Sequence, residues 1–129
     1  MKPRPVAPAL LLAALALAGC DRRGALSARQ AAQLTGGGDD RRGAAAIRRF
    51  GCGACHAIPG IPGASGQVGP PLAGIGRRAY IAGVLVNTPD AMIRWIVNPP
   101  AVDSLTAMPA LGITAGEARD IAAYLYRQP

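Results

Sequence analysis

Apolar residues recur at helical spacing in three stretches of the chain, over residues 39–50, 88–97 and 114–125. Each stretch opens on Asp or Thr, whose short side chains accept hydrogen bonds from the free N–H groups of a first helical turn. In the third stretch, Thr114 and Glu117 form a capping box. The pattern therefore predicts an all-α domain with three principal helices.

The second and third stretches each carry an apolar face that we expect to lie in the core. The members of these faces are Met92, Ile93, Trp95, Ile96, Ile121, Tyr124 and Leu125. Two prolines follow Asn98, and they are expected to stop the second helix at Val97. Between the first two helices, residues 60–76 are rich in Gly and Pro, which predicts an irregular segment that wraps around another group.

The composition indicates a small domain that needs help to complete its core. Hydrophobic residues make up 50% of the 129 residues, but Ala supplies much of this fraction. The aromatic residues are Phe50, Tyr80, Trp95, Tyr124 and Tyr126. Small domains with so few large side chains commonly rely on disulfides, a metal or a cofactor. The composition also excludes a coiled coil, a multi-span membrane protein and a collagen-like chain.

Residues 1–19 have the features of an export signal, with a basic start and an apolar run over residues 6–18 that is too short for a stable membrane span. The run ends just before Cys20, and small residues ahead of a Cys resemble the lipobox of bacterial lipoproteins. Acylation of Cys20 would account for the odd one of three cysteines in an exported chain. The alternative is an ordinary signal cut nearby, which would leave a free thiol.

The lipobox resemblance implies a domain anchored in a bacterial inner membrane and facing the periplasm. Asp21 follows the acylated position, and in Gram-negative lipoproteins that resemble this chain an Asp there commonly marks retention in the inner membrane. Residues 20–38 are expected to form a flexible linker, in which residues 27–34 could form one or two helical turns. Residues 39–129 are then expected to form the folded domain.

The net charge of +7 could indicate a protein that binds nucleic acid. The arginines occur as scattered pairs without an aromatic platform, and an exported protein meets no genome, so nucleic-acid binding is not expected. Solvated surface is one interpretation of these arginines, and docking to an acidic partner protein is the other.

Cys52, Cys55 and His56 form a C-x-x-C-H motif, the attachment signature of a c-type haem. Two thiols three positions apart can add to the two vinyl groups of one haem, and the adjacent His can bind its iron. A thioredoxin-like dithiol would need a strand before the motif, and the sequence predicts none. A zinc site would need further Cys or His ligands, and none follows the motif.

Together with Gly69-Pro70-Pro71-Leu72, Met108-Pro109 and the closing stretch Ala122-Ala123-Tyr124-Leu125, this motif resembles a class I cytochrome c over about residues 39–128. The stretch Asn87-Thr-Pro-Asp with Arg94-Trp95-Ile96 is similar to the cytochrome c domain fused to subunit II of some haem-copper oxidases. The resemblance implies three to five helices around one covalently bound haem. No oxidase subunit accompanies the domain in this sequence.

The resemblance also implies roles for further residues. The carbonyl of Pro70 would accept from the axial His, and Leu72 would pack on the haem. Arg78 or Tyr80 would bond a haem propionate, although exposure to solvent is an equal alternative for the arginine. Trp95 would reach a propionate through its indole N–H, or else serve only as core packing.

The sixth iron ligand must come from the protein or be absent. The chain has one His, so Met is the usual alternative, and a Met/His pair raises the reduction potential. Met92 lies in an amphipathic helix, where Met is more often core. Met108 lies in a loop before Pro109 and is the ligand that the family pattern implies.

These residues predict an electron carrier rather than an enzyme. The expected partners are a quinol-oxidising complex as donor and a terminal oxidase or periplasmic dehydrogenase as redox partner, with the membrane reached through the lipid anchor and no small-molecule substrate. A small peroxidase-like enzyme would need an open iron site and a distal acid–base group. A gas-sensing module, in which the Met ligand leaves the iron, is the third possibility.

Overall fold

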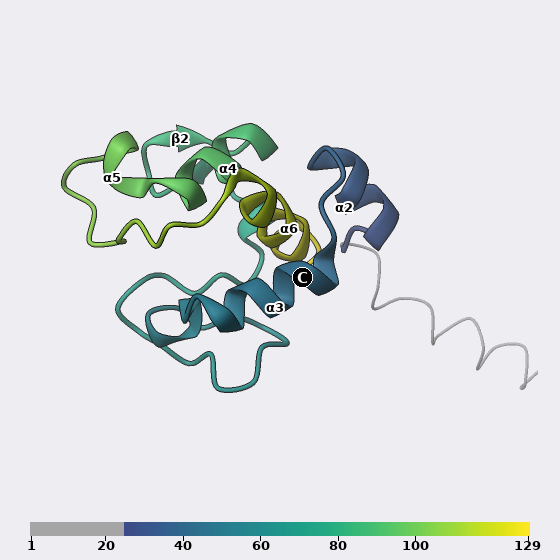
Figure 1. Ribbon diagram of the computed structural model, residues 1–129, viewed down its shortest axis with the longest axis horizontal. Helices are drawn as coiled ribbons and strands as arrows, with labels where there is room; N and C mark the ends of the chain where they lie inside the picture. Colours follow the sequence, from purple (N-terminus) through teal and green to yellow (C-terminus); the bar gives the residue numbers. More distant parts are fainter. Residues whose placement is uncertain (1–24) are drawn as a thin grey trace, which may run out of the picture.

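A computed structural model describes residues 25–129 of the chain. These residues form a small, mainly helical domain with five α-helices and one two-strand hairpin (Figure 1). In chain order the elements are α2 (Ala28–Leu34), α3 (Asp40–Arg49), the 3₁₀ turns Cys52–Ala54 and Ile75–Arg77, β1 (Tyr80–Ile81), β2 (Leu85–Val86), α4 (Pro89–Val97), α5 (Pro99–Val102) and α6 (Ala115–Tyr126). The expectation of a mainly helical domain is confirmed.

Helices α3 and α6 pack against each other at close range. Gly43 makes this possible, because a Cβ atom there would lie 2.1 Å from the backbone oxygen of Asp120. Three ion pairs reinforce the contact from the outside, and they join Arg42 to Asp120, Arg49 to Glu117, and Arg127 to Asp40. The close packing and the ion pairs thus hold α3 and α6 in one position relative to each other.

The predicted helix starts are confirmed by their caps. Asp39 accepts hydrogen bonds from the N–H groups of Arg41 and Arg42, each at 2.9 Å. Thr88 accepts from the N–H of Ala91, and Thr114 and Glu117 form the expected capping box. These side chains satisfy N–H groups that have no partner within the helix, so each start is defined locally.

Two short elements differ from the expectations. Helix α4 ends at Val97 as predicted, but the prolines begin the short helix α5, because Pro suits the first positions of a helix and Asn98 accepts from the N–H of Ala101. The hairpin of β1 and β2 was not predicted, since two-residue strands are too short to show a period. Ala82 in its turn has a φ of 51°, in the left-handed region.

Helix α2 lies inside the segment that was expected to be a flexible linker. Ser27 caps it in a capping box with Gln30, and Ala31 on its inner face has no exposed surface. Arg127 donates from Nε to the backbone oxygen of Leu26 at 3.3 Å, which ties the start of α2 to the end of α6. Residues 26–38 therefore pack on the domain instead of forming a free linker.

The expected signal, the acylated Cys20 and Asp21 lie outside the described residues. Within residues 25–129, no helix is both long and apolar enough to cross a membrane.

Candidate functional site

A cavity of about 620 Å³ lies between α3, the segment 51–83, helices α4 and α6, and the segment 106–113. Its size is within the range of sites for cofactors and small molecules. All nine residues that the sequence assigned to a cofactor line this one cavity. They are Cys52, Cys55, His56, Pro70, Leu72, Arg78, Tyr80, Trp95 and Met108.

The two cysteines stand at the wall of this cavity on a tight turn. Gly51 has a φ of 70°, which ends α3 and redirects the chain into the 3₁₀ turn that starts at Cys52. The backbone oxygen of Cys52 then accepts from the N–H of Cys55 at 3.3 Å and from that of His56 at 3.0 Å. Both cysteines are half-buried free thiols. The turn therefore presents two thiols and one imidazole to the same space.

Burial raises the pKa of the Cys52 thiol, and the neighbouring Cys55 raises it further. Cys52 is therefore a neutral thiol at pH 7. Redox-active C-x-x-C motifs commonly hold a cysteine whose pKa is lowered, because the thiolate is the attacking species. The environment of Cys52 has the opposite effect.

The ring of His56 is held by a backbone carbonyl. Its Nδ1 atom lies 2.7 Å from the oxygen of Pro70. A carbonyl can only accept, so Nδ1 carries the proton and donates. In a neutral imidazole, Nε2 then has a free lone pair, which is the state that binds a metal. The hydrogen bond that the resemblance implies for Pro70 is present.

The segment that carries Pro70 is attached to the cysteine turn by three backbone hydrogen bonds. The N–H groups of Gly66, Gly69 and Leu72 donate to the oxygens of Gly53, Cys55 and Ala57, at 3.0, 2.8 and 2.9 Å. Gly69 packs directly on the imidazole, since a Cβ atom there would lie 2.4 Å from Cε1 of His56. The Gly- and Pro-rich sequence thus allows the backbone to cover the ring closely.

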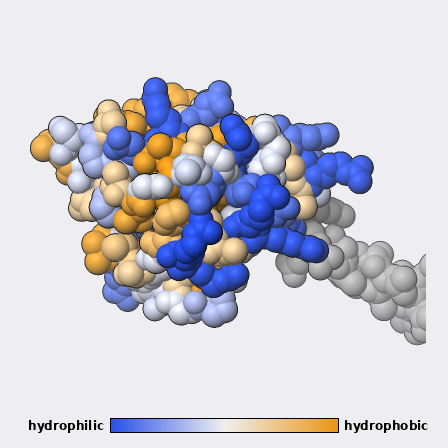
Figure 2. Space-filling view, viewed as in Figure 1, coloured by the Kyte–Doolittle hydropathy of each residue, from blue (hydrophilic) through white to orange (hydrophobic). Residues whose placement is uncertain are grey.

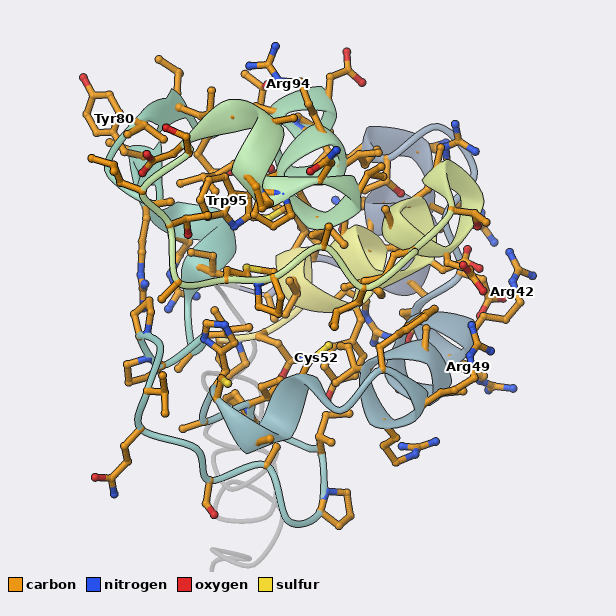
Figure 3. The ribbon with its side chains drawn as sticks, turned by 60° about the vertical axis from the view of Figure 1, so that its left-hand side comes forward. Arg42, Arg49, Cys52, Tyr80, Arg94 and Trp95 are labelled. Atoms are coloured by element: carbon orange, nitrogen blue, oxygen red, sulfur yellow. The ribbon has the colours of Figure 1, made fainter. Side chains whose placement is uncertain are left out.

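Arg78 holds the next part of the same segment. Its Nη2 atom donates to the oxygens of Pro71 at 2.6 Å and Ala73 at 3.2 Å. The guanidinium group therefore supports the segment while it lines the cavity. Tyr80 also lines the cavity, but it is 59% exposed, and Figure 3 shows its ring pointing outward at the edge of the domain.

Asn87 and Tyr126 complete this support, and the sequence did not single them out for it. Asn87 donates from Nδ2 to the oxygens of Ile75 at 2.7 Å and Arg78 at 2.8 Å, while its Oδ1 accepts from the Tyr126 hydroxyl at 2.7 Å. Burial raises the pKa of Tyr126 to about 12, so its hydroxyl stays a donor. Only the three-dimensional arrangement brings these residues together.

Across the cavity, the two methionines have different surroundings. Met92 is 2% exposed and belongs to the hydrophobic core with Trp95. Met108 is half-buried on an irregular segment, where its N–H donates to Oγ1 of Thr106 at 3.2 Å. Both side chains line the cavity, but Met92 belongs to the buried core cluster, whereas Met108 is partly buried and packs against that cluster.

The mouth of the cavity is apolar. Val68, Tyr80 and Leu111 line the cavity and are 79%, 59% and 41% exposed. Figure 2 shows apolar side chains gathered on the left of the molecule, and many strongly hydrophilic ones on the right. Exposed apolar patches on small soluble domains mark contact surfaces.

The residues present fit a c-type haem. The donors at the cavity are two thiols, an imidazole nitrogen with a free lone pair and a thioether, and most of the remaining wall is aliphatic or aromatic. This is the donor set that covalent attachment and His/Met ligation require. In the part of the chain that the structure describes, no three His, Cys, Asp or Glu residues gather to hold a metal ion by themselves.

No family model, curated protein or solved structure matches the chain.

Proposed function

We propose that this protein is an electron carrier that holds one haem covalently through Cys52 and Cys55, with His56 and Met108 as iron ligands. The observation that carries the proposal is the convergence of these four side chains on one apolar cavity. The hydrogen bond from His56 to Pro70 supports it, because it leaves Nε2 free as a ligand. A haem held in this way supplies a one-electron couple.

The chain's own residues would then do three things. The thiols of Cys52 and Cys55 would fix the position of the group, and Pro70 would hold the imidazole in one orientation. Ile47, Ile58 and Ile121 would exclude water from the interior side of the cavity, which favours a raised potential. Two protein ligands would leave no position for a substrate, as electron transfer without bond making requires.

The apolar mouth supports delivery of electrons to a protein partner. Val68, Tyr80 and Leu111 form an exposed rim around the cavity. We propose two respiratory redox partners for the carrier. The electron donor is a quinol-oxidising complex, and the second partner is a terminal oxidase or a periplasmic dehydrogenase. No nucleic acid and no small-molecule substrate is part of the proposal.

A small haem enzyme and a gas sensor are the two alternatives to the electron carrier. A small haem enzyme or a gas sensor would use the same cysteines and histidine but would need an open iron position. The chain has one His, which the proposal uses as the ligand, so a distal imidazole base is absent. The position of Met108 at the cavity supports the carrier over the enzyme, because a Met ligand would close the iron position that the enzyme needs. The sensor would use the same Met ligand and release it, so carbon monoxide binding to the wild type separates the sensor from the carrier.

We further propose that acylated Cys20 anchors the carrier to the periplasmic face of a bacterial inner membrane. Growth with an alkyne-tagged fatty acid tests this directly. The wild type should be labelled, and Cys20→Ala should not be labelled. Label that persists in Cys20→Ala, or none in the wild type, would refute the anchor without affecting the haem proposal.

The haem proposal is tested by co-expressing the chain with a haem-attachment system and analysing the product after denaturation. The intact mass should increase by one haem in the wild type, because thioether bonds survive denaturation. Cys52→Ser with Cys55→Ser should carry no covalent haem. A wild type without added mass would overturn the proposal.

A further inference from the structure

A second hollow of about 600 Å³ lies on the outside of the domain, away from the residues assigned to the haem. It is a groove lined by residues from the end of α2, from helices α4 and α5, and from the start of α6. None of the residues lining it lines the haem cavity. The groove therefore needs a separate explanation.

Helix α4 separates the groove from the cavity, and its two faces carry different residues. Met92, Trp95 and Ile96 lie on the cavity side. Asp90, Ile93, Arg94 and Val97 lie on the groove side, at the i, i+3, i+4 and i+7 spacing of one helical face. Figure 3 shows Arg94 and Trp95 leaving the helix in opposite directions. The second face of α4 is thus both apolar and cationic.

The groove combines exposed apolar surface with an excess of positive charge. Leu34 is 45% exposed at its edge, and Ile93 and Val97 form part of its floor. Arg94 and Arg119 line it, and neither forms an ion pair within residues 25–129. Asp90 is the one acidic residue among those lining the groove. An occupant with negative charges beside apolar groups would complement this surface.

The proposed lipid anchor brings the groove close to a bilayer. Four residues separate Cys20 from residue 25, where the described domain begins, and these five steps of the chain span at most about 18 Å. Helix α2, seven residues and about 10 Å long, leads from there to Leu34 at the groove. A tether this short keeps the groove at a high effective concentration near the lipid surface, so a weak contact would suffice.

We propose that this groove is the contact of the domain with the anionic phospholipids of its own membrane. Arg94 and Arg119 would meet lipid phosphates, while Leu34 and Ile93 would meet the acyl boundary. A redox partner is the less suitable occupant, because α4 separates the groove from the cavity and its mouth. Contact at the groove leaves that mouth free for such a partner. The proposal rests on the lipid anchor but not on the haem.

The test uses the full mature, acylated and haem-loaded protein, reconstituted in protein-free vesicles. One set contains phosphatidylcholine alone, and the other also contains phosphatidylglycerol. Amide hydrogen exchange is measured for peptides covering residues 33–36 and 97–102. Exchange in both segments should be slower on the phosphatidylglycerol vesicles, and high salt should remove the difference.

Arg94→Gln with Arg119→Gln should abolish the protection, because each arginine at a lipid surface changes the docked-to-undocked ratio about fivefold. The matched control is Arg41→Gln with Arg48→Gln, which removes the same charge from two exposed arginines of α3 that have no ion pair in the described part of the chain. The control should keep the protection.

Equal protection on both vesicle types, or equal loss in the control, would overturn the proposal. So would protection that occurs only in native membranes, because it would assign the groove to a protein partner. The haem spectrum of the same samples separates the two proposals. A wild type that attaches no haem would refute only the electron carrier, and an intact haem spectrum without groove protection would refute only the groove.

Discussion

The Nδ1 atom of His56 lies 2.7 Å from the backbone oxygen of Pro70, fourteen residues further along the chain. Neither atom could be positioned by the C-x-x-C-H turn alone. The contact depends on Gly69, whose missing side chain lets the backbone lie against the imidazole. The orientation of the proposed ligand is therefore set by the Gly- and Pro-rich segment as much as by the motif.

Gly69→Ala tests that relationship. The new methyl group would lie 2.4 Å from Cε1 of His56, so the ring must move and its hydrogen bond to Pro70 should weaken. We expect a loss of about 1–3 kcal/mol in the free energy of unfolding, with an altered spectrum of the bound haem. Gly116→Ala is the matched control, because the nearest atom there is 4.0 Å away and the position is helical. Urea unfolding that shows the two variants equally stable would contradict the account.

Asn87→Ala tests how Asn87 supports the backbone at Ile75 and Arg78, at the end of the Gly- and Pro-rich segment. The change removes the hydrogen bonds to the oxygens of Ile75 and Arg78 and leaves the hydroxyl of Tyr126 without its acceptor, while the oxygen of Ile75 keeps the N–H of Arg78. We expect a loss of about 1–3 kcal/mol in the free energy of unfolding, measured with urea. Tyr126→Phe removes one of the three bonds and should cost less. A larger loss in Tyr126→Phe than in Asn87→Ala would show that Asn87 is not the centre of this support.

Asp120→Asn tests the contact of α3 with α6 through its pH dependence. The hydrogen bond from Arg42, together with the N–H of Asp39, lowers the pKa of Asp120 below its ordinary value of 3.8. The unfolded chain therefore binds the proton more readily, and the stabilisation is complete above that value and lost as the pH falls through the folded pKa.

The wild type should accordingly melt at a higher temperature than Asp120→Asn at pH 7, and the difference should close in acid. Asp103→Asn serves as the control, since within residues 25–129 the carboxylate of Asp103 accepts only from the N–H of Leu105 in its own turn. A gap between wild type and Asp120→Asn that stays constant down to pH 2 would rule out this ion pair as its source.

The sequence predicted those features that short segments determine by themselves. Asp39, Thr88 and Thr114 cap helices because each bonds to N–H groups two or three residues away, which is visible in one dimension. The C-x-x-C-H motif is local in the same way. The local motif identified Cys52, Cys55 and His56, and the family resemblance supplied the distant residues. All nine proposed cofactor residues line one cavity.

The features that were missed depend on contacts between distant segments. The helical turns expected over residues 27–34 are confirmed by α2, but its packing on the domain was missed, because that packing depends on Ala31 and on the hydrogen bond from Arg127 to the backbone oxygen of Leu26. The hydrogen bonds of Asn87 could not be predicted, because only the fold places Ile75 and Tyr126 beside it. The groove is formed by four separate elements, so no single stretch of sequence could reveal it.

Met92→Ala should behave as a core truncation. Its side chain is 2% exposed, and we expect a loss of about 2–5 kcal/mol in the free energy of unfolding. The sulfur-to-iron charge-transfer band of the oxidised protein should stay, because Met108 is the proposed ligand. Loss of that band in Met92→Ala, with the band intact in Met108→Ala, would exchange the roles of the two methionines.

Carbon monoxide binding to the reduced protein is the most direct test of the carrier assignment. If Met108 occupies the sixth iron position, the wild type should resist carbon monoxide, while Met108→Ala should bind it quickly and have a lower reduction potential. Peroxidase activity should appear only in the variant. A wild type that binds carbon monoxide readily and turns over peroxide would contradict the electron carrier and favour the enzyme or the sensor.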